Sequence, residues 1–200
     1  WVADYTGSRA VHLSADGAEL ASSSTELVVR PRSVSVNPMD GSCWVADSSG
    51  QGKVVHLEED GATLWQSASG TVDSPAAVAV NSTDDSCWVA DSGGGQVVKL
   101  SAAGADLWRS SPGEFGGPYF VSVNTTDGSC WVADRFGSEV VHVSATGAEL
   151  WRSTDGAFSS PYSVSANPTD GSCWVADYSA SKVVHLSSAG TELWRSSDRQ

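Results

Sequence analysis

One short motif recurs along the whole chain at an almost constant interval. The sequence Trp-Val-Ala-Asp begins five times, 43 or 44 residues apart, at Trp1, Trp44, Trp88, Trp131 and Trp174. The similarity extends over the full period, since Val-Val-His-Leu or a sequence that differs from it at one position follows each motif, and Gly-x-x-Leu-Trp closes the period in most copies. A repeat of this length indicates copies of one supersecondary unit. We therefore predict a single domain of five repeats, at 1–30, 31–73, 74–117, 118–160 and 161–200.

Each repeat contains short apolar runs separated by turn-forming residues. In the second repeat these runs cover 33–37, 42–47, 53–57 and 62–66, with Asp-Gly turns after the first and the third. Val and Trp dominate the runs, and 20 Gly and 7 Pro suit a chain with many turns. Four strands per repeat, and only three in the first repeat, predict an all-β domain of 19 strands.

The second strand of each repeat carries small or apolar residues on both faces. Cys43 and Val45 lie on one face, and Trp44 and Ala46 lie on the other. Such a strand is covered on both sides, so each sheet must pack against copies of itself, and radial packing leaves only short edges. This favours a β-propeller of five near-identical four-stranded blades, alone or as part of a larger ring. A linear β-solenoid is the competing architecture.

The first repeat begins at Trp1, inside its second strand, so the first blade lacks its inner strand. We expect the 200 residues to be a piece of a longer chain. If no other segment supplies the missing strand, the backbone edge of this incomplete blade offers a place where a partner can add a strand.

An aspartate ends the second strand of every repeat. Loops rich in Gly and Ser follow most of these aspartates, and a carboxylate in a turn commonly accepts hydrogen bonds from backbone N–H groups. We therefore interpret them as structural loop caps. A ring of hard cations such as calcium is the alternative, because such ions take oxygen ligands. The residues are Asp4, Asp47, Asp91, Asp134 and Asp177.

Histidine and cysteine also recur at fixed positions. Rotation about a propeller axis carries equivalent residues apart, so we predict neither a metal site from the histidines nor disulfides from the cysteines. The cysteines should be buried free thiols, and the tryptophans should pack between blades. The histidines are His12, His56, His142 and His185, with Lys99 in the third repeat, and the cysteines are Cys43, Cys87, Cys130 and Cys173.

The charge balance excludes two classes of partner. With 11 Lys and Arg against 24 Asp and Glu, the net charge is −13, so we predict no nucleic-acid partner and no attraction to anionic membranes. The absence of any run of 18 apolar residues also predicts no membrane insertion. Sequons at Asn81 and Asn124 would permit glycosylation in a secretory setting. The sequence leaves the location open and favours a secreted or cell-surface one.

The repeat resembles the NHL-repeat propeller family, in which a strand ending in Val-x-Asp precedes a loop and a Val-rich strand. The shared pattern is Cys-Trp-Val-Ala-Asp followed by Val-Val-His-Leu, and it covers the whole chain. The family includes scaffolds, RNA-binding modules and a zinc-dependent lyase that cleaves peptidylglycine derivatives. The acidic charge does not suit RNA, and no unique histidine set matches the lyase's metal site. The closing Gly-x-x-Leu-Trp also resembles the tryptophan-docking repeats of quinoprotein propellers.

Near-identical repeats lack the local asymmetry that an active site needs. We therefore predict a non-catalytic binding or scaffold propeller, without cofactor or metal, that contacts a protein, peptide or glycan through loops on one face. A structural repeat segment of a larger secreted or surface protein is one alternative, and an NHL-like metal-dependent lyase or a quinoprotein-like enzyme is another. The candidate binding residues in these loops are Tyr5, Arg9, Gln51, Arg135, Phe136 and Tyr178.

Overall fold

The structure, a computed structural model, describes residues 1–197, which form 19 strands in five antiparallel sheets. The first sheet has three strands, β1 (Val2–Asp4), β2 (Arg9–Leu13) and β3 (Glu19–Ser22). The second sheet contains β4 (Pro31–Val36), β5 (Cys43–Asp47), β6 (Lys53–Leu57) and β7 (Thr63–Gln66), and the third contains β8 (Pro75–Asn81), β9 (Ser86–Asp91), β10 (Gln96–Leu100) and β11 (Asp106–Arg109). The fourth contains β12 (Pro118–Val123), β13 (Cys130–Asp134), β14 (Glu139–Val143) and β15 (Glu149–Arg152), and the fifth contains β16 (Pro161–Ala166), β17 (Cys173–Asp177), β18 (Lys182–Leu186) and β19 (Glu192–Arg195).

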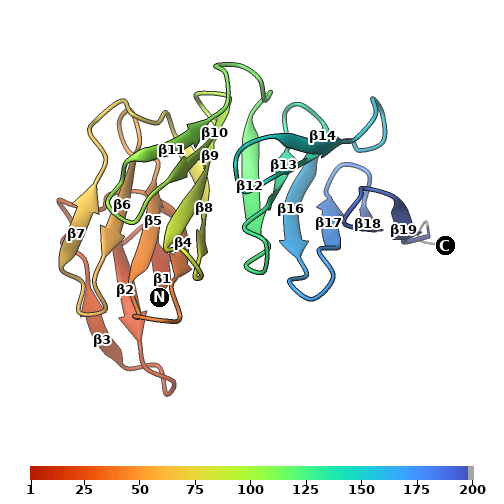
Figure 1. Cartoon of the computed structure of the whole chain (residues 1–200). Helices are drawn as coiled ribbons and strands as arrows, with labels where there is room; N and C mark the ends of the chain where they lie inside the picture. The colour runs from red at the N-terminus through yellow and green to blue at the C-terminus, as the bar shows by residue number, and fades with distance from the viewer. Residues whose placement is uncertain (198–200) are drawn as a thin grey trace.

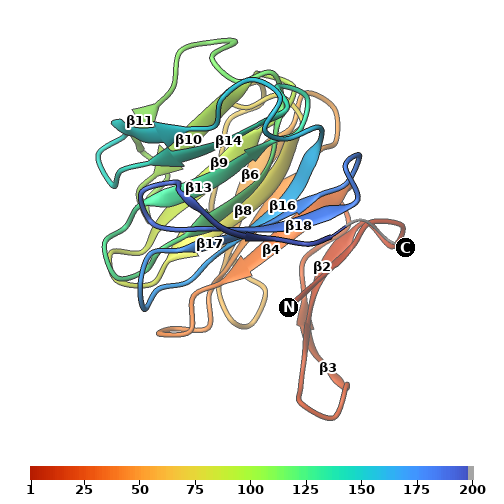
Figure 2. The ribbon, with the colours of Figure 1, turned by 90° about the vertical axis from the view of Figure 1, so that its right-hand side faces the viewer.

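The sheets follow one another around an arc, as the blades of a propeller do. Figure 1 shows the first strands β4, β8, β12 and β16 towards the middle, with β3, β7 and β19 towards the outside. Consecutive first strands contact each other, β4 with β8, β8 with β12 and β12 with β16, and the first and fifth sheets form the two ends of the arc (Figures 1 and 2). The predicted all-β propeller and its 19 strands are confirmed. No helix in the described part of the chain could cross a membrane.

The first strand of a blade begins two residues earlier than predicted, at a proline. Pro31 pairs with Asp47, and the register shifts before Ser33 pairs with Ala46. Proline is tolerated at the first position of a strand because its missing N–H interrupts no ladder there. The same arrangement recurs at Pro118 and Pro161.

Each blade has two unlike faces, which we name the Trp face and the Val face. The Trp face carries the Trp and Ala of the second strand, the first Val and the His of the third strand, and the Trp of the fourth. The Val face carries the Cys and Val of the second strand and the second Val and Leu of the third. Between the second and third blades, Trp44, Ala46 and Val54 pack against the Val face of Cys87, Val89, Val98 and Leu100. The next two interfaces repeat this pattern, and the four cysteines are free and buried, as predicted.

The fifth blade departs from the prediction that both faces of every blade are covered. Trp44, Trp88 and Trp131 are fully buried, whereas Trp174 is 43% exposed. Val183 is 43% exposed, and its counterpart Val140 is buried. The prediction was wrong here because no described sheet packs against the Trp face of this blade.

Candidate functional site

A cavity of about 480 Å³ lies where the first strands of the blades converge. In the second to fifth blades, the first strand begins with a proline that pairs with the aspartate at the end of the second strand. The residue after this proline therefore lies at the same end of the blade as the loop that follows the aspartate. These residues are Arg32, Ala76, Tyr119 and Tyr162, and all four line the cavity. Ala3 and Tyr5 of the first blade complete the wall. All five blades contribute, which places the cavity at the mouth of the propeller axis.

Aromatic rings surround a guanidinium group beside this axial cavity. The Arg135 guanidinium lies 5.0 Å from the ring centroid of Tyr119, 5.1 Å from that of Tyr162 and 5.2 Å from that of Phe136. The hydroxyls of Tyr119 and Tyr162 are 3.1 Å apart, and the ring of Tyr178 is 6.1 Å from that of Tyr162. Cation–π attraction holds the charge between the rings. Within residues 1–197, neither Arg32 nor Arg135 forms an ion pair with a carboxylate.

Tyr162 does not supply a base in this cluster. The hydrogen bond with Tyr119 raises the pKa of the Tyr162 phenol, and burial adds to the shift. The phenol therefore stays protonated at neutral pH and is available as a hydrogen-bond donor. The cluster can hold an anion or a flat ring, and it offers no nucleophile paired with a base.

The structure brings four of the six predicted loop residues to this region. Tyr5 lines the cavity, Arg135 and Phe136 contact each other, and Tyr178 packs on Tyr162. Arg9 lies elsewhere, because its Nη1 is 3.1 Å from both carboxylate oxygens of Glu19. Gln51 does not line the cavity either; its side-chain oxygen lies near Gly70.

Sequence reasoning missed the residues contributed by the first strands, Arg32, Tyr119 and Tyr162. The signal was present, since the residue after the strand-opening proline is Arg, Ala, Tyr and Tyr in successive repeats, while the proline and the valine three residues after it do not change. Variation inside a fixed frame marks positions that packing does not dictate. Only the convergence of the first strands at the axis makes these residues neighbours.

The carboxylates that end the second strands accept backbone hydrogen bonds. Asp47 accepts from the N–H groups of Val29, Arg30 and Ser49 at 2.8–3.0 Å, and Asp134 accepts from Gly116, Gly117 and Gly137 at 2.7–3.1 Å. These bonds tie each loop to the segment that precedes the first strand of the same blade. Among the described residues, no group of three or more His, Cys, Asp or Glu side chains could hold a metal ion.

The histidines lie between blades, away from the axis. The ring of His142 stacks on Trp131 with centroids 4.1 Å apart. Its Nδ1 is 3.0 Å from the Ser188 carbonyl of the next blade, and its Nε2 is 3.0 Å from the Ser129 hydroxyl. Lys99 replaces histidine in the third blade and donates to the Ala145 carbonyl at 3.1 Å. A lysine can make the same contact to a carbonyl, so the position requires a hydrogen-bond donor and not a metal ligand.

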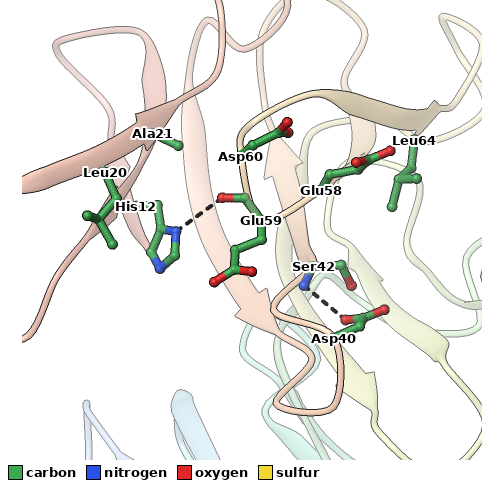
Figure 3. Close-up of a pocket in the computed structure, with 9 residues that line it drawn as sticks. All are labelled: His12, Leu20, Ala21, Asp40, Ser42, Glu58, Glu59, Asp60 and Leu64. Carbon is green, nitrogen blue, oxygen red and sulfur yellow. Dashed lines mark hydrogen bonds between the residues drawn. The ribbon is translucent and has the colours of Figure 1, made fainter.

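A second cavity, of about 640 Å³, lies between the outer parts of the first two blades. Figure 3 shows His12 bonded to the Glu59 carbonyl and the Asp40 carboxylate bonded to the Ser42 N–H, with acidic side chains around the opening. Ala21 stands where the other blades have the tryptophan of the fourth strand, so a hollow remains. Because Leu20 is 61% exposed and Leu64 is 49% exposed at its rim, this hollow would enclose a ligand less closely than the axial mouth.

The fold and the axial cavity together define a β-propeller with a ligand-sized site at its axis. No protein-family model matches the chain, and no curated protein matches it in sequence. Among solved structures, a streptogramin B lyase is 14% identical with a TM-score of 0.75, covering 98% of this chain and 64% of that chain. Virginiamycin B lyase from Staphylococcus aureus is 14% identical with a TM-score of 0.77, covering 98% of this chain and 65% of that chain.

A protein of unknown function from Bacteroides caccae is also similar, with 14% identity, a TM-score of 0.65, and coverage of 96% of this chain and 75% of that chain. At this level of identity, the likeness shows the fold alone. The present chain spans less than two thirds of the length of the two lyase structures. The matches support a β-propeller without singling out the NHL-repeat family.

Proposed function

We propose that this propeller binds a carboxylate-bearing glycan or peptide at its axial mouth without converting it chemically. The observation that carries the proposal is the Arg135 guanidinium held among three aromatic rings with no carboxylate partner among residues 1–197. In a protein of net charge −13, this is a local site for an anion. A guanidinium binds a carboxylate through two parallel hydrogen bonds, and tyrosine rings offer flat surface together with a hydroxyl.

The site is composite rather than repeated. Its residues come from all five blades, and the four positions after the strand-opening prolines hold three kinds of side chain, arginine, alanine and tyrosine, at Arg32, Ala76, Tyr119 and Tyr162. We therefore expect one ligand per chain. Loop residues Tyr5 and Tyr178 would contact the ligand from the rim, which keeps the binding surface on the face that the loop variation predicts.

The first test measures binding to glycan and peptide arrays with the folded protein. We expect carboxylate-bearing ligands to bind, and we expect Arg135→Gln to weaken their affinity by about 10- to 100-fold, because the residue is the charged centre of the site. Arg9→Gln is the matched control, since Arg9 lies outside the cavity and already pairs with Glu19. The wild-type affinity should fall as salt is raised. An equal loss in the Arg9 variant, or binding only to neutral ligands, would contradict the proposal.

Two alternatives give other results in the same experiment. A propeller that is only a structural segment of a larger protein binds no array ligand. The enzyme alternative is favoured by the lyase structures, one of which is a catalytically inactive histidine-to-alanine variant with quinupristin. In the present chain the four histidines stack on or face tryptophans between blades. We therefore expect a ligand recovered after incubation to be chemically unchanged by chromatography and mass spectrometry.

A further inference from the structure

The Trp face of the fifth blade is an uncovered copy of a surface that is covered elsewhere in the molecule. Trp174 and Val183 are each 43% exposed, and Trp194 is 49% exposed. On the fourth blade, the equivalent Trp131 and Val140 are fully buried against Cys173, Val175, Val184 and Leu186 of the next sheet. The molecule therefore contains, at its own interfaces, the structure that fits this face.

Polar groups on the same face also lack the partners that their counterparts have. His142 uses one ring nitrogen on the Ser188 carbonyl of the next blade and the other on Ser129 of its own blade. In the fifth blade, the counterparts of the pair inside the blade, His185 Nε2 and Ser172 Oγ, are buried without a hydrogen-bond partner among the described residues, so this internal bond is also not formed in the blade whose Trp face is uncovered. Trp131 donates its indole N–H to the Gly171 carbonyl of the next blade at 3.2 Å. A matching neighbour would offer Trp174 and His185 backbone carbonyls at the corresponding points.

We propose that the Trp face of the β16–β19 sheet is a docking surface for one further blade of this same repeat, which engages it through a Val face. The fitting sheet has the Cys-x-Val and Val-x-Leu pattern and a glycine beneath the ring of Trp194. The glycine is required because a Cβ at Gly190 would lie 2.1 Å from the Trp151 ring at the preceding interface.

The other end of the arc carries the complementary surface. On the first blade, Val2 is 45% exposed and Leu13 is 38% exposed, whereas the equivalent Val45 and Leu57 are buried. Gly17 holds the position on which the strand-four tryptophan rests in three interfaces, yet nothing lies within 4 Å of a Cβ placed there. Added blades would therefore present a Val face to the fifth blade and a Trp face to the first.

The size of the opening distinguishes a further repeat from a second copy of the chain. The superposed virginiamycin B lyase has about a third of its chain beyond the part matched here, which corresponds to roughly two or three repeats of this length. A second copy brings five sheets, too many for that arc. The proposal therefore commits to additional repeats and not to a dimer of this chain.

The test extends the full chain after Gln200 with a copy of residues 115–160. This copy makes the link from Arg195 to the new first strand as long as the natural link from β15 to β16. Hydrogen exchange of residues 173–186 is measured by mass spectrometry. We expect at least about tenfold slower exchange than in the unextended chain, because covered strands open less often. In the matched control extension, Asp replaces the two residues copied from Val132 and Val141. We expect residues 173–186 to exchange as fast in this control as in the unextended chain.

Three results would overturn the proposal. The first is equal protection by both extensions. The second is fast hydrogen exchange throughout the appended repeat while the parent chain remains folded, because the Trp face of the fifth blade would then not bind the repeat. The third comes from sedimentation of the unextended chain: a concentration-dependent dimer that Trp174→Lys abolishes assigns the face to a second copy. A monomer at all concentrations, together with protection by the matching extension alone, supports the proposal.

Discussion

Asp47 and Asp91 occupy the same place in consecutive blades, yet their surroundings shift their pKa values in opposite directions. Burial raises the pKa of Asp47, but N–H groups of Val29, Ser49 and Arg30 outweigh it, so the pKa lies below the usual value. Burial raises the pKa of Asp91 to about 6. Asp91 accepts one short bond, from the Asp73 N–H at 2.7 Å, and a longer one from Gly94 at 3.4 Å. The number of well-placed donors decides which effect dominates.

The raised pKa of Asp91 predicts that the stability of the protein depends on pH through this carboxyl group. The pKa of Asp91 in the folded state is about 6 against an ordinary 3.8, so between these values the native chain binds more protons than the unfolded chain. The contribution of Asp91 to the free energy of unfolding is complete below about pH 4 and is lost as pH rises to about 6. The free energy of unfolding changes by about 1–2 kcal/mol over this range. Asp91→Asn should remove this part of the pH dependence of the free energy of unfolding, measured with urea at pH 4–7.

The Asp47→Asn variant provides the comparison for the Asp91 measurement. The pKa of Asp47 is lowered in the folded state, so its stabilising contribution is present above the ordinary pKa and is lost as pH falls through the lowered one. We expect Asp47→Asn to destabilise the protein at pH 7 and to leave the loss between pH 4 and pH 6 in place. An unchanged pH profile in the Asp91 variant would show that its carboxylate is solvated in solution.

At the scale of the blade, a tryptophan resting on a glycine joins neighbouring sheets. Trp65, Trp108 and Trp151 of the fourth strands cover Gly104, Gly147 and Gly190 of the next blade, and a Cβ at any of these glycines would lie 1.8–2.1 Å from the ring. The backbone at Gly147 has φ +91°, a region that side chains disfavour. Two independent requirements, backbone conformation and space, therefore select glycine at these three positions.

A matched pair of variants separates these two requirements. Gly17 has φ +86° with open space where a Cβ would stand, whereas Gly147 has φ +91° and lies under Trp108. We expect Gly147→Ala to lower the free energy of unfolding by about 1–3 kcal/mol more than Gly17→Ala, because only the former displaces a packed ring. Urea unfolding followed by circular dichroism measures both. Equal losses would mean that backbone strain alone explains the glycines.

The sequence predicts the elements well because their determinants are local. Alternation in Cys43–Asp47 and the Asp-Gly turns depend on neighbouring residues, and the third strand at Lys53–Leu57 agrees with its predicted bounds. The start of the first strand was misplaced, since pairing of Pro31 with Asp47 depends on tertiary contacts. The candidate site was predicted only in part for the same reason. Tyr119 and Tyr162 are a full repeat apart, and only the packing of adjacent blades around the axis brings their hydroxyls together.

At the scale of the whole molecule, equivalent residues differ in how many blades cover them. Repeat proteins derive their stability from each unit and from its interfaces with its neighbours. The second to fourth blades each have two such interfaces, and the fifth has one among the described residues. When the same substitution is made at equivalent positions of two blades, the removed atoms and the strand are the same. A difference in the loss of stability therefore shows how far neighbouring blades cover each position.

Trp131 and Trp174 provide this comparison. Trp131 is fully buried between two blades, whereas Trp174 is 43% exposed and retains its stacking on His185. We expect Trp131→Ala to lower the free energy of unfolding by about 3–5 kcal/mol and Trp174→Ala to lower it by about half as much, in proportion to the apolar area removed from water. Urea unfolding at several protein concentrations checks this. Equal losses at low concentration would show that the Trp face of the fifth blade is already covered in solution, because only burial on both sides makes an indole ring contribute so much.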